Sequence, residues 1–316
     1  MVPSVLTPSG PVEIPGFVFA RTGAKIIPVH HSGPGNLSDA PAWYAEDGRT
    51  TIQAALDLCR SGRGDVVQLL PGHTETISGA DAWSNLGTKT GVTIRGPGFG
   101  PPATITWATA TTTALMDAAD FVIDGGPNRG IILQMEPTTG SVNVAAPITV
   151  SAARCKILNT RQFFGTDANN KVTIGITTTA GADYFEYSGN HAIGATAAEC
   201  TTFLQIVGAD GLRMFNNVIE GATSAVGVGI VRFATTASLN IWLENNTYIN
   251  RKALSTCAVT GLAGVSGVSR NEHFAYLDTS SLTPWLTSTG IMTFHRPTVT
   301  NTAGETGTEV VGTVSA

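Results

Sequence analysis

Carboxylates are the side chains of this sequence best suited to bond-breaking chemistry, because glycoside hydrolysis uses two of them about 5 to 9.5 Å apart. A repeated short strand, described below, places one residue of each repeat in a common outward row. The acidic members of that row are Asp124 and Glu244, which lie four repeats apart, or about 19 Å at the spacing of neighbouring strands. Glu186 lies outside the row. We therefore predict that the repeats hold no catalytic carboxylate pair.

Histidine and cysteine residues give no stronger candidate. His73 stands two residues before Glu75, a spacing that suits a His–carboxylate dyad, but the repeat places no Ser or Cys nucleophile beside it. His30 and His31 are adjacent in an extended segment, so their side chains point opposite ways and do not form a metal pair. The cysteines have no close spacing, which argues against a zinc site or a disulfide framework and favours small buried hydrophobic side chains: Cys59, Cys155, Cys200 and Cys257. The sequence thus predicts no catalytic, cofactor-binding or metal-binding residue.

The composition indicates a strand-rich chain. Of the 316 residues, 13% are charged, 42% are hydrophobic and 36 are Gly. Abundant Thr, Val and Ile together with Gly favour short strands joined by tight turns. The net charge of −5, with scattered Lys and Arg, predicts no nucleic-acid partner. No apolar run approaches the roughly 18 residues of a membrane span, and the start at Met1 lacks the pattern of a secretory signal.

A short strand recurs along the chain as an apolar, any, apolar pattern followed by a turn residue. It occupies 92–96, 121–125, 155–159, 185–189, 212–216 and 241–245 and, more weakly, 268–272. Further strands are expected at 131–135, 172–176, 203–207 and 230–233. A period near 29 residues without helical crossovers predicts an all-β, parallel β-helix solenoid of about seven coils. The predicted inward residues are Val92, Ile94, Phe121, Ile123, Cys155, Ile157, Leu212, Met214, Ile241 and Leu243.

Asparagines follow several of these strands, at Asn159, Asn216-Asn217 and Asn245-Asn246. Asparagine tolerates the left-handed backbone conformation that a sharp corner needs, and stacked amides can bond to one another along the axis. Ordinary hairpin turns are the alternative explanation for these residues.

The two ends differ from the repeats. The segment 51–60 has one apolar face with Thr50 or Thr51 as its N-cap, and predicts a helix that caps the first coil. We divide the chain into an extended Pro-rich arm at 1–45, the β-helix at 46–283 and a tail at 284–316. The apolar side chains of the arm and tail lack a strand or helix pattern that would bury them, so we predict that they bind a partner: Ile14, Phe17, Phe19, Trp43, Trp285 and Phe294. The tripeptide Arg63-Gly64-Asp65 suggests cell adhesion, but its place between a helix and a strand favours a simple turn.

Residues 51–57 followed by 65–72 resemble the entrance to right-handed parallel β-helix proteins of the pectate-lyase-like superfamily. More narrowly, 62–65, 70–77 and 91–96 resemble a group of short tailed-phage β-helix virion proteins. This resemblance implies a structural role on the particle, a homotrimer and contact with the major capsid protein. The sequence lacks the Asn-Thr-Asp, Asp-Asp, Gly-His-Gly and Arg-Ile-Lys motifs of the polygalacturonase-like members.

We therefore expect a non-enzymatic phage virion protein that decorates or cements the capsid surface after assembly in the host cytoplasm, with no cofactor. A polysaccharide-degrading tailspike or lyase of the same fold is the alternative. A cell-surface adhesin is a third possibility.

Overall fold

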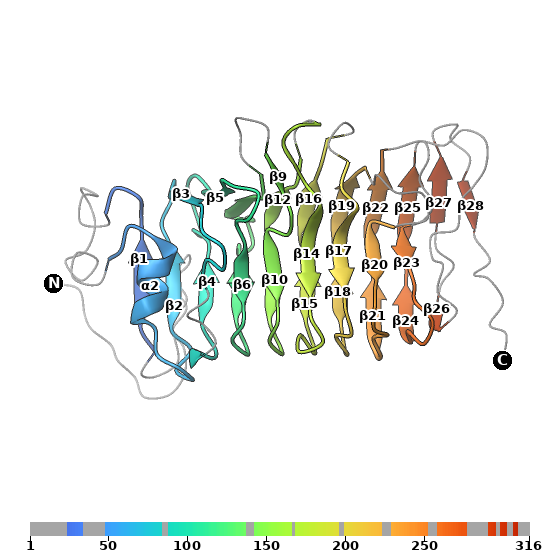
Figure 1. The fold of residues 1–316 in the computed structure, drawn as a ribbon, viewed down its shortest axis with the longest axis horizontal. Helices are drawn as coiled ribbons and strands as arrows, with labels where there is room; N and C mark the ends of the chain where they lie inside the picture. Colours follow the sequence, from blue (N-terminus) through green and yellow to red (C-terminus); the bar gives the residue numbers. More distant parts are fainter. Residues whose placement is uncertain are drawn as a thin grey trace.

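The computed structural model describes residues 24–33, 48–83, 88–136, 142–165, 168–195, 199–222, 229–251, 258–276, 290–294, 298–301 and 306–308. From residue 298 on, and at Tyr276 and Phe294, it describes the backbone alone. The described residues form a parallel β-solenoid of about seven turns, elongated along the axis on which the turns stack (Figure 1). The one helix within this part of the chain, α2, is too short to span a membrane.

Three sheets form the faces of the solenoid. Sheet 1 has ten strands: β1 (Ile26–Val29), β2 (Val66–Leu69), β4 (Thr93–Arg95), β7 (Val122–Asp124), β11 (Lys156–Leu158), β15 (Glu186–Ser188), β18 (Arg213–Phe215), β21 (Ile241–Glu244), β24 (Gly267–Arg270) and β26 (Ile291–Phe294). Sheet 2 has ten strands: β3 (Thr74–Ile77), β5 (Ala103–Trp107), β8 (Ile131–Gln134), β12 (Arg161–Phe163), β16 (His191–Ile193), β19 (Val218–Gly221), β22 (Thr247–Asn250), β25 (His273–Tyr276), β27 (Thr298–Asn301) and β28 (Thr306–Thr308).

Sheet 3 has six strands: β6 (Ala114–Met116), β10 (Ile148–Val150), β14 (Ile174–Thr178), β17 (Thr202–Ile206), β20 (Val231–Phe233) and β23 (Val259–Thr260). A small fourth sheet pairs β9 (Asn143–Val144) with β13 (Lys171–Val172). The strands within the three large sheets pair in parallel, except that β28 runs antiparallel to β27. Each complete turn therefore visits the three sheets in the same order.

The core consists of inward rows from the three sheets. All ten residues predicted to face inward have no exposed surface. Phe185 is also fully buried, whereas Tyr184 beside it is 57% exposed, which confirms the strand at 185–189 in the predicted register. Cys59, Cys155 and Cys200 are buried and unpaired, and burial raises the pKa of each thiol to about 12. Cys257 lies outside the described residues.

One expectation about the strands is wrong in detail. The weak seventh repeat begins at Gly267, which pairs with Ile241, and not at Val268. A polar inward residue, Ser269, hides the apolar pattern, while a Cβ on Gly267 would lie 2.2 Å from the Ile241 carbonyl oxygen. The further strands expected at 131–135, 172–176, 203–207 and 230–233 are present and belong to two sheets, since β8 lies in sheet 2 and β14, β17 and β20 lie in sheet 3. The later strands β12, β16 and β19 of sheet 2 are missed in the sequence analysis because they are only three or four residues long. Each buries a single central side chain, Gln162, Ala192 or Ile219, with no apolar alternation around it.

The N-terminal end contains a helix and an additional strand. Helix α2 (Ile52–Leu58) begins after Thr51, whose hydroxyl accepts a hydrogen bond from the Ala54 N–H at 3.2 Å, and its buried face packs on β1 and β2. Strand β1 lies inside the predicted arm and pairs with β2 at the outer edge of sheet 1. Pro28 is tolerated there because an edge strand can do without one N–H. Residues 26–29 are therefore part of the solenoid.

The corner between sheets 1 and 2 uses the left-handed conformation, as predicted for Asn159, Asn216 and Asn245. These residues have φ of 51°, 54° and 55°, and Asn271 at the equivalent position has φ of 53°. Asn271 also donates to Asn245 Oδ1 at 3.1 Å. Asparagine is one of the few side chains that adopt this conformation at low cost.

A column of buried polar side chains follows these corner residues and consists of Thr160, Asn190, Asn217, Asn246 and Glu272. Each asparagine Oδ1 accepts the backbone N–H of the column residue one turn earlier, at 2.9 Å (Thr160 N), 3.0 Å (Asn190 N) and 3.1 Å (Asn217 N). Each amide group donates to a backbone carbonyl of the preceding turn, at 2.8, 2.7 and 3.1 Å. The predicted stacking of Asn217 and Asn246 is confirmed, and the column satisfies backbone groups that are buried at the corner.

Glu272 is the last member of the column within the described residues. Its Oε1 accepts from the Asn246 amide at 3.1 Å, while Oε2 is buried without a hydrogen-bond partner beside the equally unpartnered Tyr248 hydroxyl. Burial raises the pKa of Glu272 to about 8, and Glu244 adds a smaller increase. Glu272 is therefore a neutral acid near pH 7.

We expect Ile123→Asp to lower the free energy of unfolding by about 4 kcal/mol or more, because it places an unpaired charge in the stacked core. Val122→Asp is the matched control, since Val122 points outward next to Lys156. Chemical denaturation followed by far-UV circular dichroism measures both variants. Equal losses in the two variants would contradict the inward and outward assignment.

We expect Glu272→Gln to remove a pH dependence of stability. The native carboxyl titrates near 8 and its ordinary value is 4.5, so the native state binds more protons between these values and the wild type loses stability as pH rises through them. Because the Gln amide cannot ionise, the free energy of unfolding of the variant should exceed that of the wild type by on the order of a few kcal/mol at pH 9. Denaturation at pH 5, 7 and 9, with Glu199→Gln as control, measures this. The prediction is refuted if the free energy of unfolding of Glu272→Gln falls from pH 5 to pH 9 as much as that of the wild type.

Candidate functional site

The predicted outward carboxylates lie far apart. Asp124 on β7 and Glu244 on β21 occupy one row of sheet 1 with three strands between them, a separation of about 19 Å. Asp124 accepts the Gly126 N–H at 2.8 Å and the Asn159 amide at 3.2 Å, so it serves a corner of the solenoid. The row continues to Arg270, and not to Asn271 as expected, because of the register at Gly267.

The His73–Glu75 pair does form. His73 Nε2 lies 3.2 Å from Glu75 Oε2, and the His73 side chain is fully buried. The same Glu75 oxygen accepts the Ile52 N–H at 2.8 Å, at the first turn of α2. The pair therefore joins the beginning of β3 to the helix. Within the described residues, no three His, Cys, Asp or Glu side chains are arranged to hold a metal ion.

The tripeptide Arg63-Gly64-Asp65 is also structural. Asp65 has no exposed surface, and its two oxygens accept the Lys25 and Arg60 N–H groups at 2.7 Å each. Burial alone would raise the pKa of Asp65, but these hydrogen bonds outweigh it and lower the pKa. A carboxylate held in this way is not available to an adhesion receptor.

The outer face of sheet 1 carries an exposed apolar and charged group toward its C-terminal end. We call it the Trp242 surface, and it comprises Phe215, Trp242, Glu244, Val268, Arg270 and Met292. Trp242 is 46% exposed and Met292 is 57% exposed. They occupy one row across neighbouring strands, with Val268 between them. Exposed large apolar side chains are normally scattered, so this adjacent pair is the candidate contact surface on sheet 1.

Polar contacts fix the indole ring of Trp242. Its Nε1 donates to Glu244 Oε2 at 3.1 Å, and Glu244 Oε1 lies 3.5 Å from Arg270 Nη1. Phe215 meets the indole edge-on, with ring centroids 6.4 Å apart. Because the polar edge of the ring is already bonded, its exposed part is free to pack against a partner.

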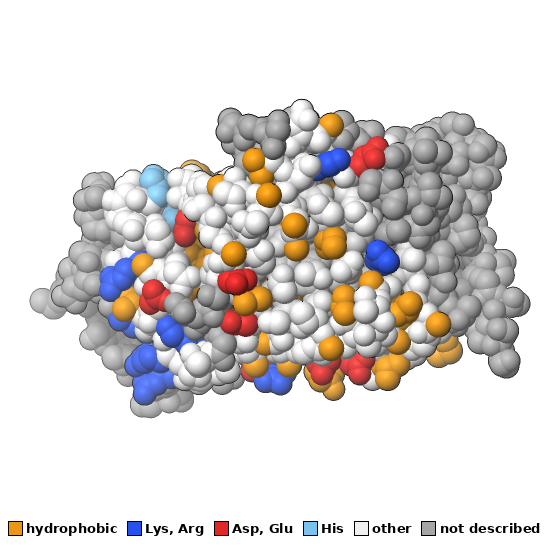
Figure 2. All heavy atoms as spheres, viewed as in Figure 1, with side chains coloured by type: hydrophobic (Ala, Val, Ile, Leu, Met, Phe, Trp, Pro, Cys, Tyr) orange, Lys and Arg blue, Asp and Glu red, His pale blue; other side chains and the backbone are white. Residues whose placement is uncertain are grey.

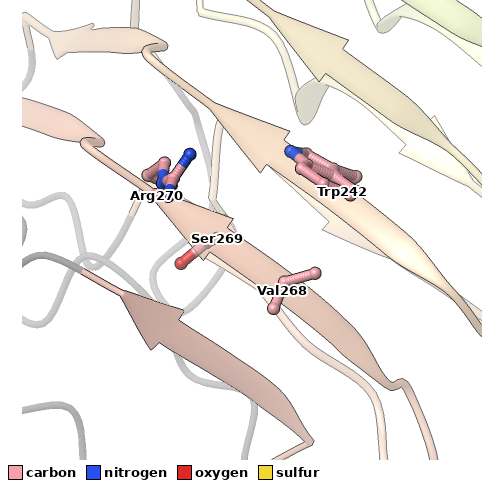
Figure 3. A pocket seen from close by; sticks show the side chains of 4 residues that line it. All are labelled: Trp242, Val268, Ser269 and Arg270. Atoms are coloured by element: carbon pink, nitrogen blue, oxygen red, sulfur yellow. The ribbon is translucent and has the colours of Figure 1, made fainter.

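A shallow pocket of about 190 Å³ adjoins the ring (Figure 3). Trp242 contributes from β21, and Val268, Ser269 and Arg270 contribute from the next strand, β24 (Figure 3). Along the same face, Glu186 pairs with Lys156 at 2.8 Å and accepts from the Ser188 hydroxyl at 3.1 Å. Arg213 lies in register between Glu186 and Trp242. The site thus combines a rigid aromatic ring with both signs of charge.

The Trp242 surface is not the interface that the sequence predicts. Ile14, Phe17, Phe19, Trp43 and Trp285 lie outside the described residues. For Phe294 the structure describes the backbone, which ends β26 and pairs with Arg270 of β24. The missed signal is the alternation of the strand 241–245, which buries Ile241 and Leu243 and so must expose Trp242. Only the carboxylates among the outward residues are considered in the sequence analysis, which therefore misses Trp242.

Comparison with protein-family models, with curated proteins and with solved structures finds no match for this chain.

Proposed function

We propose that this chain is a non-enzymatic structural protein of a phage particle, which decorates or cements the capsid surface. Two observations support the proposal. The segments 62–65, 70–77 and 91–96 resemble short phage β-helix virion proteins. The Trp242 surface then supplies an exposed, rigid apolar contact on the solenoid.

The Trp242 surface is the observation that carries this proposal. Aromatic and Arg side chains dominate the binding energy of protein interfaces when the surroundings hold them in place. Trp242 is held by Glu244 and Phe215, and Arg270 stands at the rim. The hydrophobic side chains visible on the face drawn in Figure 2 also gather toward the lower edge of the C-terminal half. This end of the solenoid therefore suits docking on another protein.

The finer features belong to the same proposal. The solenoid is right-handed, α2 caps its first turn, and the chain forms a homotrimer that contacts the major capsid protein. The apolar residues of the arm and tail, Ile14, Phe17, Phe19, Trp43, Trp285 and Phe294, join subunits or hold the particle. The resemblance supports these features, and the particle experiment below is their first test.

We expect Trp242→Ala to weaken binding to capsids that lack this protein by about tenfold or more, the effect of truncating an interface anchor. Phe99→Ala is the matched control, because Phe99 is 63% exposed but lies between β4 and β5, far along the chain from the Trp242 surface. Sedimentation of the labelled protein with such capsids measures binding, and circular dichroism checks folding. Undiminished binding of a folded Trp242→Ala protein would remove the surface from the proposal.

A specific observation favours polysaccharide degradation as a second candidate function. Glu186 on β15 and Glu244 on β21 lie two strands apart on sheet 1 and two residues apart along the strands, about 12 Å in all, with Arg213 on the strand between them and Trp242 two residues before Glu244. A sugar chain lying across these strands would meet an aromatic ring and carboxylates on both sides.

The first function predicts that the purified protein releases no reducing ends from host capsular polysaccharide or polygalacturonate. Glu186→Gln should then leave folding and capsid binding within about 0.5 kcal/mol of the wild type, as for surface changes, and Glu244→Gln should leave folding within the same limit. Asp124→Asn is the control, because Asp124 lies outside this pair. Cleavage that Glu186→Gln or Glu244→Gln abolishes and Asp124→Asn retains would establish the second function instead.

A further inference from the structure

Strand β1 is fastened at both ends by polar groups. At its start, the Lys25 N–H donates to Asp65 Oδ1 at 2.7 Å. At its end, the His30 N–H donates to the Arg49 carbonyl at 3.0 Å, and the Gly33 N–H returns to the His30 carbonyl at 2.8 Å. The strand itself is short and packs Ile27 and Val29 into the core. These bonds hold both ends of β1 in place beside β2.

The imidazole of His30 takes part in this fastening. Its Nδ1 accepts the Ser32 N–H at 3.3 Å, a bond that requires Nδ1 to carry no proton. The ring is buried, with 7% of the residue exposed. The turn that ends β1 is thus built for a neutral His30.

Other titratable groups surround this ring. The His31 ring centroid lies 4.3 Å from that of His30 and 6.4 Å from that of His73. His73 is fully buried, and its Nδ1 meets no hydrogen-bond partner. The groups that face the cluster from the other elements are Glu75, bound to His73, and Arg49, whose backbone bonds to His30. Figure 2 shows histidine side chains at the surface near the N-terminal end of the solenoid.

We propose that His30 makes β1 an acid-sensitive latch, in which protonation of its ring breaks the turn after β1 and opens the pairing with β2. A proton on Nδ1 removes the acceptor of the Ser32 N–H and places a charge in a buried position. The neighbouring His31 and His73 rings add electrostatic repulsion at His30. Glu75 does not offset this at His30, because it bonds to His73 and to α2.

The direction of the effect follows from proton binding. Burial, then His31 and His73, lower the pKa of His30 from its ordinary value of 6.5. Once β1 has opened, the His30 ring titrates at its ordinary pKa of 6.5. The open state therefore binds more protons than the closed state in acid, and the closed state loses stability as pH falls through 6.5. Asp65 at the other end acts in a lower range, because its lowered pKa is below 3.8. The histidine step is thus separate from general acid unfolding.

The latch controls the end of the chain to which the sequence assigns partner binding, but it does not depend on that function. Opening of β1 would uncover the edge of β2 and the side chains against which Ile27 and Val29 pack. The physical statement concerns the β1–β2 pairing alone and can be tested without a partner.

Hydrogen exchange of the full-length protein tests the latch. The amides of Ile26, Ile27 and Val29, corrected for intrinsic exchange and compared with those of β18, should open more at pH 5.5 than at pH 7.5, by up to about tenfold. A group with a pKa of 6.5 in the open state that binds no proton in the closed state raises the opening equilibrium constant about tenfold between pH 7.5 and pH 5.5. His30→Gln should reduce the change to less than twofold, whereas the control His191→Gln, in sheet 2, should keep it.

Equal opening of wild-type β1 at the two pH values would overturn the latch, and so would a change of the same size in His30→Gln. If His30→Gln opens β1 at both pH values, the NMR titration of the wild-type His30 ring decides. Its midpoint must coincide with the midpoint of β1 opening, and a separation of more than one pH unit would refute the proposal. None of these outcomes depends on capsid binding, so they are independent of the test with Trp242→Ala.

Discussion

Stacked turns stay aligned only if the backbone groups at the corners are paired as well as those in the strands. The column of Thr160, Asn190, Asn217 and Asn246 meets this need, because each amide bonds to backbone in the neighbouring turn. The corner residue before each column position takes the left-handed conformation and turns the chain from sheet 1 to sheet 2. With the corner fixed, the register of both ten-stranded sheets is fixed too, and the inward rows close into one core.

The same register decides what the outside of the molecule offers. Alternation along a strand means that burial of Leu243 exposes Trp242 and Glu244, and parallel stacking places their neighbours Val268 and Arg270 beside them. Carboxylates that occupy the same position in different repeats lie far apart along the axis, as Asp124 and Glu244 do. The surface therefore concentrates an apolar contact at one end of sheet 1 and spreads its acidic groups.

The buried aspartate and histidines, and one buried glutamate, lie where the described stacking begins or ends. Asp65, His73 and His30 lie around the first turns, and Glu272 ends the described column. Inside the stack, each polar group of the column finds a partner in the turn before or after it. At an end, that partner is missing or comes from another element, such as the start of α2 for Glu75. Protonation at these positions can therefore alter stability.

The sequence by itself determined the solenoid, because short-range alternation and turn residues such as Asn216 and Asn245 act within a few residues of the chain. It also determined the inward rows of sheet 1, where every predicted inward residue is apolar until Ser269. Only the tertiary structure decided which sheet each second strand joins and that β1 belongs to the body. It alone placed Trp242 beside Arg270 and the His73 ring near that of His31. These contacts join residues about one turn or more apart in the chain, and their geometry depends on the register of the whole stack, which no local pattern encodes.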